Sequence, residues 1–295
     1  MKCDLHVHSI HSGACPAPVL RHFFLESYSA PLDVYQTLRA RGMDLVTLTD
    51  HDAICGAEEL RRFPDFFVSE EVTCRMPSGT QVHIGVYDLS ERQHNEIQAR
   101  RNDLIRLLSY LSEQRLLYSI NHVFSSLTGR RDPDDFCWFD EYFPAFEALN
   151  GQMLPEANRL ASSLARRSRK IRLAGSDAHA LASVGSAYTE VPWARDKEEF
   201  FAGLRTGHGR LCGESGSFAK LTRDILLLCV EMMAEKPWTV LLAPLVALVP
   251  AGVLVNLFRE GAFARRWGAH FGLTPAAKPD LRPVDSRPAW EEAKP

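Results

Sequence analysis

Histidines and carboxylates recur in short polar motifs through the first two thirds of the chain. His6 and His8 flank Val7, and in a strand side chains two residues apart point to the same side, so both imidazoles can reach one metal ion. A single pair of this kind is weak evidence, because such histidines are often ordinary surface or core residues. Five further motifs carry the same residue types, and they contribute Asp50, His51, Glu71, His83, His122, Asp177 and His179. Imidazole and carboxylate donors without a cysteine thiolate suit Zn, Mn or Fe, so this recurrence predicts a metal centre.

The elements that would position these side chains follow from the alternation of apolar runs and amphipathic stretches up to about residue 220. Strands are expected at residues 3–9, 44–52, 66–74, 81–89, 116–124, 145–151 and 171–179. Helices are expected at residues 31–42, 95–114 and 155–170. Strand followed by helix, in repeated units, predicts a parallel β/α barrel. Because the C-terminal ends of barrel strands form one rim, the histidines and acids at those ends would converge there.

The order of these motifs resembles that of a known family. DLHVHS, LTDHD, EEVT, VHI, NH and GSDAH occur in this order between residues 4 and 179, as in the PHP (polymerase and histidinol phosphatase) superfamily. The resemblance covers roughly the first two thirds of the chain. It implies an α/β fold, a distorted seven-stranded (β/α) barrel with two or three divalent metal ions at the C-terminal ends of the strands.

The resemblance also implies a set of metal ligands. One metal would be held by His6, His8, Glu71 and Asp177; Glu71 would bridge to a second held also by His83 and His122; His51 and His179 would belong to a third. Glu71 is preferred to Glu70 as the bridging acid because Val72 and Thr73 follow it, as they do in the family. The segment after His8 departs from the family pattern, since it offers only His11 as a further third-site ligand. Whether His11 is a ligand or a loop histidine stays open.

Two ions that share a water would lower its pKa toward ~7, and the resulting hydroxide could attack a phosphate ester. Asp177, His179 and His51 are candidates for the proton transfers that this reaction needs. Arg130 and Arg131, in the loop after His122, are candidates for binding the substrate phosphate, and a solvated surface pair is the alternative.

The function expected from the sequence is therefore that of a metal-dependent phosphoesterase with two or three Zn, Mn or Fe ions as cofactors. Its substrate would be a small phosphorylated metabolite, a nucleotide or a short oligonucleotide. The first alternative is a non-catalytic, metal-stabilised module that acts as a membrane-associated partner protein. The second is a deacetylase-like or amidohydrolase-like reaction, because the same hydroxide can attack a carbonyl carbon.

Composition excludes several other classes of protein. The 295 residues are 45% hydrophobic and 24% charged, which is enough for a sizeable core and rules out a disordered chain. The formal charge of −3 gives no general attraction to nucleic acid, so a complex with extended duplex is not expected. The seven cysteines show no CxxC spacing, and the first residues contain no signal-peptide-like apolar run. A reducing, cytoplasmic location is expected.

The composition changes after residue 220, and three parts are expected: a barrel at 1–220, an apolar helical segment at 221–258 and a Pro-rich, disordered tail at 259–295. Residues 238–258 contain no charge over 21 positions, about the length of a membrane-spanning helix. Pro244 and Pro250 would interrupt a straight span, and Arg259 follows the segment. A kinked contact with the inner face of the membrane, a buried helix and an oligomer-forming helix remain alternatives.

Overall fold

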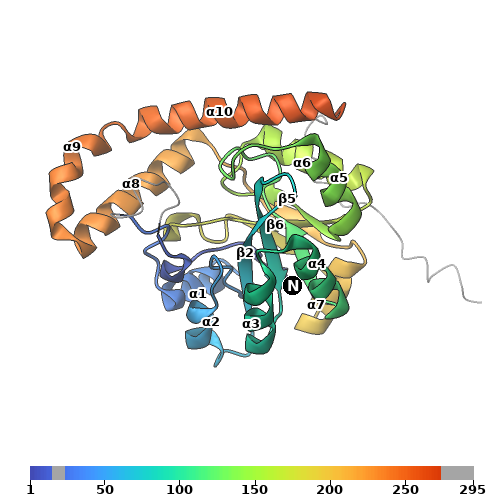
Figure 1. Ribbon diagram of the computed structural model, residues 1–295. Helices are drawn as coiled ribbons and strands as arrows, with labels where there is room; N and C mark the ends of the chain where they lie inside the picture. Colours follow the sequence, from blue (N-terminus) through green and yellow to red (C-terminus); the bar gives the residue numbers. More distant parts are fainter. Residues whose placement is uncertain (15–23, 274–295) are drawn as a thin grey trace, which may run out of the picture.

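The computed structural model describes residues 1–14 and 24–273, which form a mixed α/β fold with two open sheets (Figure 1). The larger sheet has the strand order β2–β3–β4–β5–β6. Its strands are β2 (Ser69–Arg75), β3 (Gln81–Tyr87), β4 (Leu117–Ile120), β5 (Ala145–Asn150) and β6 (Ile171–Gly175). The smaller sheet has the order β1–β7–β8, with β1 (Lys2–Cys3), β7 (Ala187–Glu190) and β8 (Arg210–Gly213). The expected α/β class is confirmed.

The helices surround the larger sheet and continue into a C-terminal helical region. They are α1 (Pro31–Ala40), α2 (Cys55–Leu60), α3 (Glu91–Arg100), α4 (Leu104–Glu113), α5 (Pro133–Tyr142), α6 (Pro155–Arg167), α7 (Lys197–Arg205), α8 (Phe218–Glu235), α9 (Ala243–Val246) and α10 (Val249–His270), with short 3-10 helices η1 (Ile10–Ser12), η2 (Leu181–Ser183) and η3 (Pro237–Leu242). The helix expected at 95–114 is two helices, because the Asp103 side chain accepts a hydrogen bond from the Arg106 amide and starts α4.

The prediction of a closed, parallel, seven-stranded barrel is corrected by the sheet topology. Among the described residues no sheet closes, and β2, β3 and β4 pair antiparallel, whereas only β4, β5 and β6 pair parallel. The segments expected as strands at 3–9 and 44–52 form isolated bridges, such as Val7 with Ala178, beyond the two residues of β1. Backbone amides of the first segment donate hydrogen bonds to side chains of the second. The Val7 amide donates to Thr49 Oγ1 at 2.9 Å, and the Ser9 amide donates to Asp50 Oδ1 at 2.6 Å. A regular strand ladder cannot form where side chains take its donors.

The main core lies between the larger sheet and the helices α4, α5, α6 and α10. It includes Val72, Ile84, Ile120, Phe146, Leu107, Phe136, Leu160 and Trp267. The second half of α10 therefore covers the core through Trp267, which is 4% exposed. Helix α10 continues across the domain boundary expected at residue 258, and the part of the expected tail from residue 274 onward lies outside the described residues.

The first half of α10 belongs to a helical arm, formed with α8, η3 and α9, that extends from the body (Figure 1). Its large apolar side chains are between 48% and 79% exposed at Trp238, Val240, Leu241, Leu245, Leu248, Leu254, Val255 and Phe258. No single helix in the described ranges is long and apolar enough to cross a membrane. Pro237–Val246 and Val249–His270 reach that length and hydropathy only as a pair, with a 64° bend between them.

Candidate metal centre

Glu71 lies at the centre of a cluster of histidines. Its side chain is 1% exposed, and β2 presents it to five imidazoles that come from four different segments. Its Oε2 atom lies 3.2 Å from His6 Nε2, 3.6 Å from His8 Nε2 and 3.3 Å from His51 Nδ1, and its Oε1 atom lies 3.6 Å from His83 Nδ1 and 3.3 Å from His122 Nε2. The two oxygens thus face two different groups of imidazoles, which is the geometry that a bridging carboxylate requires.

Glu70, the other candidate for the bridging acid, points elsewhere. Its Oε2 atom accepts a hydrogen bond from Gln98 Nε2 at 2.7 Å and lies 2.9 Å from His94 Nδ1, so it is held by helix α3. Because successive residues of a strand face opposite sides, β2 can turn only one of the two acids toward the histidines.

Asp177 faces the same pair of histidines as Glu71 from the other side. Its Oδ1 atom lies 3.5 Å from His6 Nε2, 3.3 Å from His8 Nε2 and 3.7 Å from His179 Nδ1. The residue follows β6 with a φ of 50°, a left-handed conformation that aspartate tolerates better than most residues. Gly175 precedes it where the chain passes close to His6: a Cβ on Gly175 would lie 2.2 Å from the His6 Cβ. The glycine of GSDAH is therefore required for this approach.

All eight side chains predicted as metal ligands come together in four overlapping groups, within each of which the donor atoms lie within 4.8 Å of one another. The groups are His6, His8 and Asp177; His6, Glu71 and His122; His51, Glu71 and His83; and His8, His51 and His179. His6 Nε2, His8 Nε2, His51 Nδ1 and His122 Nδ1 are buried without a hydrogen-bond partner. A buried nitrogen without a hydrogen-bond partner costs free energy unless another group, such as a metal ion, occupies it. Three of these four nitrogens face the Glu71 carboxylate, so the donor set fits divalent metal ions.

The charges of the cluster also suit metal binding. Burial would raise the pKa of Glu71, but His6, His83 and His51 outweigh it and hold that pKa well below its usual range. Burial, with His8 beside it, lowers the pKa of His179 to about 4, and burial lowers the pKa of His51 well below its usual value. The ionised carboxylate and these two neutral imidazoles are in the forms that bind metal, whereas at His6, His8 and His122 burial is outweighed by the nearby acids, which raise the pKa values, so a metal would have to displace protons there.

A second layer of polar residues orients these side chains. Glu147 Oε1 lies 2.7 Å from His6 Nδ1, and Glu147 Oε2 accepts hydrogen bonds from the His122 amide at 2.8 Å and from Asn150 Nδ2 at 2.9 Å. Asn121 Nδ2 donates to Glu71 Oε1 at 2.8 Å. Sequence reasoning missed these three residues, although Asn121 is part of the NH motif and Glu147 and Asn150 lie in the strand expected at 145–151.

We expect Glu147→Gln to weaken metal binding by about 10- to 100-fold, the usual effect of removing a group that orients a ligand. One oxygen of Glu147 faces the His6 imidazole and the other accepts two hydrogen bonds. The NH2 group of glutamine would replace one of these oxygens and could not accept the hydrogen bond made there. Competition with a coloured chelator measures the affinity. Glu96→Gln, which removes an exposed acid on α3, is the control. Equal affinities of the Glu147→Gln and wild-type proteins would contradict the orienting role.

Glu26, and not His11, lies beside the group formed by His8, His51 and His179. His11 is one-third exposed, with its Nε2 atom 3.9 Å from Glu59; neither it nor Glu26 is in the metal-binding groups found among the described residues, but only Glu26 lies against one of their histidines. Glu26 Oε2 lies 3.4 Å from His51 Nε2, and burial raises the pKa of Glu26 to about 8. Its only signal in the sequence is an acid directly after the apolar run FFL. Because 17 positions separate His8 from Glu26, the sequence gives no sign that they lie close together.

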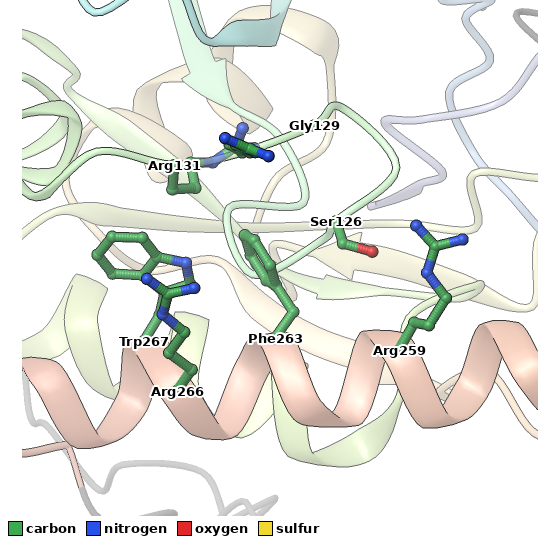
Figure 2. A pocket seen from close by; sticks show the side chains of 8 residues that line it. Ser126, Gly129, Arg131, Arg259, Phe263, Arg266 and Trp267 are labelled. Carbon is green, nitrogen blue, oxygen red and sulfur yellow. The ribbon is translucent and has the colours of Figure 1, made fainter.

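Arg130 and Arg131 are not in the histidine cluster. They line a cavity of about 450 Å³ between the loop after His122 and helix α10 (Figure 2). Arg131 is buried, and its guanidinium donates to the Gln81 carbonyl at 3.0 Å and to Thr128 Oγ1 at 2.7 Å, whereas Arg130 is exposed. The six cysteines of the described ranges are free, and none contributes to the metal-binding groups.

Comparisons with known proteins found one family model and several solved structures that are similar to this chain. The PHP-associated family model matches residues 155–208, which contain Asp177 and His179. No curated protein matches the chain significantly. Among the similar solved structures, PsfC from Pseudomonas syringae PB-5123 has 17% identity and a TM-score of 0.53, and the match covers 79% of this chain and 98% of that chain. The lesion-specific endonuclease PfuEndoQ from Pyrococcus furiosus has 17% identity and a TM-score of 0.49, with 71% of this chain and 57% of that chain covered. An amidohydrolase from Chromobacterium violaceum has 15% identity and a TM-score of 0.48, with 68% of this chain and 96% of that chain covered. At these identities the likeness concerns the fold alone.

The open sheets and the buried cluster define an α/β protein with a histidine–carboxylate site suited to divalent metals. The match of the PHP-associated model to residues 155–208 confirms the resemblance to the PHP superfamily that the sequence motifs carry.

Proposed function

We propose that the chain is a metal-dependent phosphoesterase. The match of the PHP-associated model and the resemblance of the sequence motifs to the PHP superfamily support a metal-dependent hydrolase. The observation that carries the proposal is Glu71, whose two oxygens face separate groups of imidazoles. A pair of divalent ions held in this way activates water and neutralises the oxygens of a phosphate ester.

The proposed ligand sets combine those that the resemblance implies with the distances in the cluster. His6, His8, Glu71 and Asp177 would hold one ion; Glu71, His83 and His122 would hold the second; His51, His179 and Glu26 would hold a third. In this proposal Glu26 takes the place that the sequence left to His11.

Side-chain exposure distinguishes the floor of the site from its open side. His6, His8 and Glu71 are at most 2% exposed, whereas Asp177 is 15% and His179 is 27% exposed. A substrate would therefore approach over His179 and Asp177. These two residues and His51, which is 15% exposed, are placed to exchange a proton with the attacking water or the leaving oxygen.

The test combines elemental analysis with hydrolysis of an aryl phosphate and a short oligonucleotide. We expect two or more bound metal ions in the wild-type protein, and loss of both metal and hydrolysis in His8→Ala and Asp177→Ala. Glu96→Gln is the control and should retain both. Bound metal without hydrolysis of either compound would contradict the proposal and favour a carbonyl substrate or a non-catalytic module. Absence of metal would overturn the site itself.

The exposed apolar side chains of the helical arm favour a second, compatible role, contact with a membrane surface. Leu241 and Leu245 are 79% and 59% exposed, and the arm offers no charge between residues 238 and 258. The protein should sediment with membranes and be released by detergent but not by salt. Leu241→Asp combined with Leu245→Asp should abolish this binding, and Ile105→Asp, at an equally exposed site on α4, should not. Release by salt alone would contradict an apolar contact.

A further inference from the structure

The cavity between helix α10 and the loop at residues 126–131 is lined by an unusual number of arginines (Figure 2). The lining residues are Ser126, Gly129, Arg130, Arg131, Arg259, Phe263, Arg266 and Trp267. Arg259 and Arg266 are seven residues apart on α10, which is about two helical turns, so both extend from the same face toward the loop. The cavity is within the size range of small-molecule sites.

The four arginines have little to neutralise them. Within the described ranges none of them forms an ion pair with a carboxylate, although the neighbouring Arg265 Nη1 lies 3.4 Å from Glu156 Oε2. Two buried acids, Glu260 and Asp135, lie near Arg131 and offset part of this charge, but the four arginines outnumber them. Glu260 accepts from the amide and the hydroxyl of Ser126, and Asp135 accepts from the Asp132 amide and from Ser78. The cavity therefore carries a net positive charge, which would attract an anionic ligand.

Arg131 gives a second, independent indication of an anionic ligand. It is 7% exposed, and its Nε atom is buried without a hydrogen-bond partner. Burial lowers the pKa of Arg131 to about 10, so the guanidinium remains charged at neutral pH. A buried charge with an unused donor is costly unless a ligand supplies an acceptor.

The walls of the cavity also include aromatic surface. Phe263 lies between Arg259 and Arg266 along α10, and the Arg266 guanidinium lies 5.6 Å from the centre of the Trp267 ring. Arginine and aromatic side chains in one groove are the combination that binds a phosphate and stacks a base of single-stranded nucleic acid.

This cavity borders the proposed metal centre. Gln81, whose carbonyl accepts from Arg131, lies two residues before His83, which is about 7 Å along the strand. Its Nε2 atom is 3.3 Å from His83 Nε2. Ser126 is only four residues after His122, so both the loop and β3 connect the arginines to histidines of the cluster.

We propose that this arginine cavity is a phosphate subsite for a substrate with more than one phosphate group, such as a short single-stranded oligonucleotide. It holds a phosphate that does not react, with the adjoining base against Phe263, while the scissile phosphate lies at the histidine cluster. The assignment rests on the proposed phosphoesterase activity for its role in the reaction, but the binding of the phosphate does not depend on that activity.

The test compares Arg259→Gln combined with Arg266→Gln against the control Arg265→Gln, on the same helix. Binding of a 5′-labelled thymidine trinucleotide to the full chain is followed by fluorescence anisotropy. We expect the double variant to bind at least about tenfold more weakly than the wild type, because charge-assisted hydrogen bonds are lost, and its salt dependence should be shallower. The control should bind as the wild type does. Equal binding by the double variant, or equal weakening in the control, would overturn the subsite.

Kinetics separate the subsite from the metal chemistry. The double variant should raise the KM of the trinucleotide about tenfold or more. An aryl phosphate has one phosphate and cannot reach the histidine cluster and the arginine cavity together, so the double variant's kcat/KM for this substrate should stay at the wild-type value. An equal loss on both substrates would overturn the subsite. Hydrolysis of neither substrate by the wild type would instead refute the proposed function, and the binding comparison would still decide whether the cavity takes a phosphate.

Discussion

Replacing Glu71 by glutamine is expected to remove the bound metal and to lower kcat/KM for phosphate ester hydrolysis by at least about 10³-fold, because activation by metal ions contributes several kcal/mol. The substitution keeps the size and shape of the side chain. It leaves one acceptor oxygen where the site has two, each facing a different group of imidazoles. It also removes the negative charge that would attract and partly neutralise the two cations at the centre of the cluster.

The matched control for this substitution is Glu70→Gln, one residue earlier on the same strand. Glu70 contacts His94 and Gln98 of helix α3 instead of the cluster, so this variant should keep its metal content and its activity. Elemental analysis and steady-state kinetics on the two variants measure both properties. Loss of metal in Glu70→Gln with retention in Glu71→Gln would refute the arrangement around Glu71.

The residues of the site were easier to predict than the elements that carry them. The His6-x-His8 spacing and GSDAH place their side chains by local geometry alone, and all eight predicted ligands lie in the cluster. Helices α1 and α6 begin where expected because Pro31 and Pro155 mark their first residues. The strands expected at 3–9 and 44–52 were largely wrong, since apolar alternation does not reveal that Thr49 and Asp50 would bind the backbone amides of the neighbouring segment.

The parts that sequence reasoning missed depend on contacts between distant segments. Glu147 is 141 residues from His6, and no spacing rule connects them. The arginine cavity likewise depends on how α10 packs against the loop at 126–131. Arg130 and Arg131 were candidates for binding the substrate phosphate, whereas Arg259 was noted only as a charge that follows the apolar segment. Packing of Trp267 into the core is what brings Arg259 and Arg266 to the cavity.

Removing the metal should also lower the stability of the folded chain. A ligand at 100 times its Kd stabilises the folded state by about 2.7 kcal/mol per site. Two such sites correspond to about 10 °C or more in Tm for a chain of this length. We therefore expect a chelator to lower Tm by about that amount, and added Zn, Mn or Fe to restore it, as measured by scanning calorimetry. In Glu71→Gln the chelator should have little effect. An unchanged wild-type Tm would contradict a buried metal centre.

The metal-dependent part of this stability should decrease in acid. Burial lowers the pKa of His6, but Glu71, Asp177 and Glu147 outweigh it, so the pKa of the metal-free imidazole is raised well above its usual value. Metal must displace a proton from such a group, and this displacement becomes harder as the pH falls. The difference in Tm with and without metal should therefore be larger at pH 8 than at pH 6. A difference that grew toward pH 6 would contradict coordination by these imidazoles, because protons would then be assisting the binding of a cation.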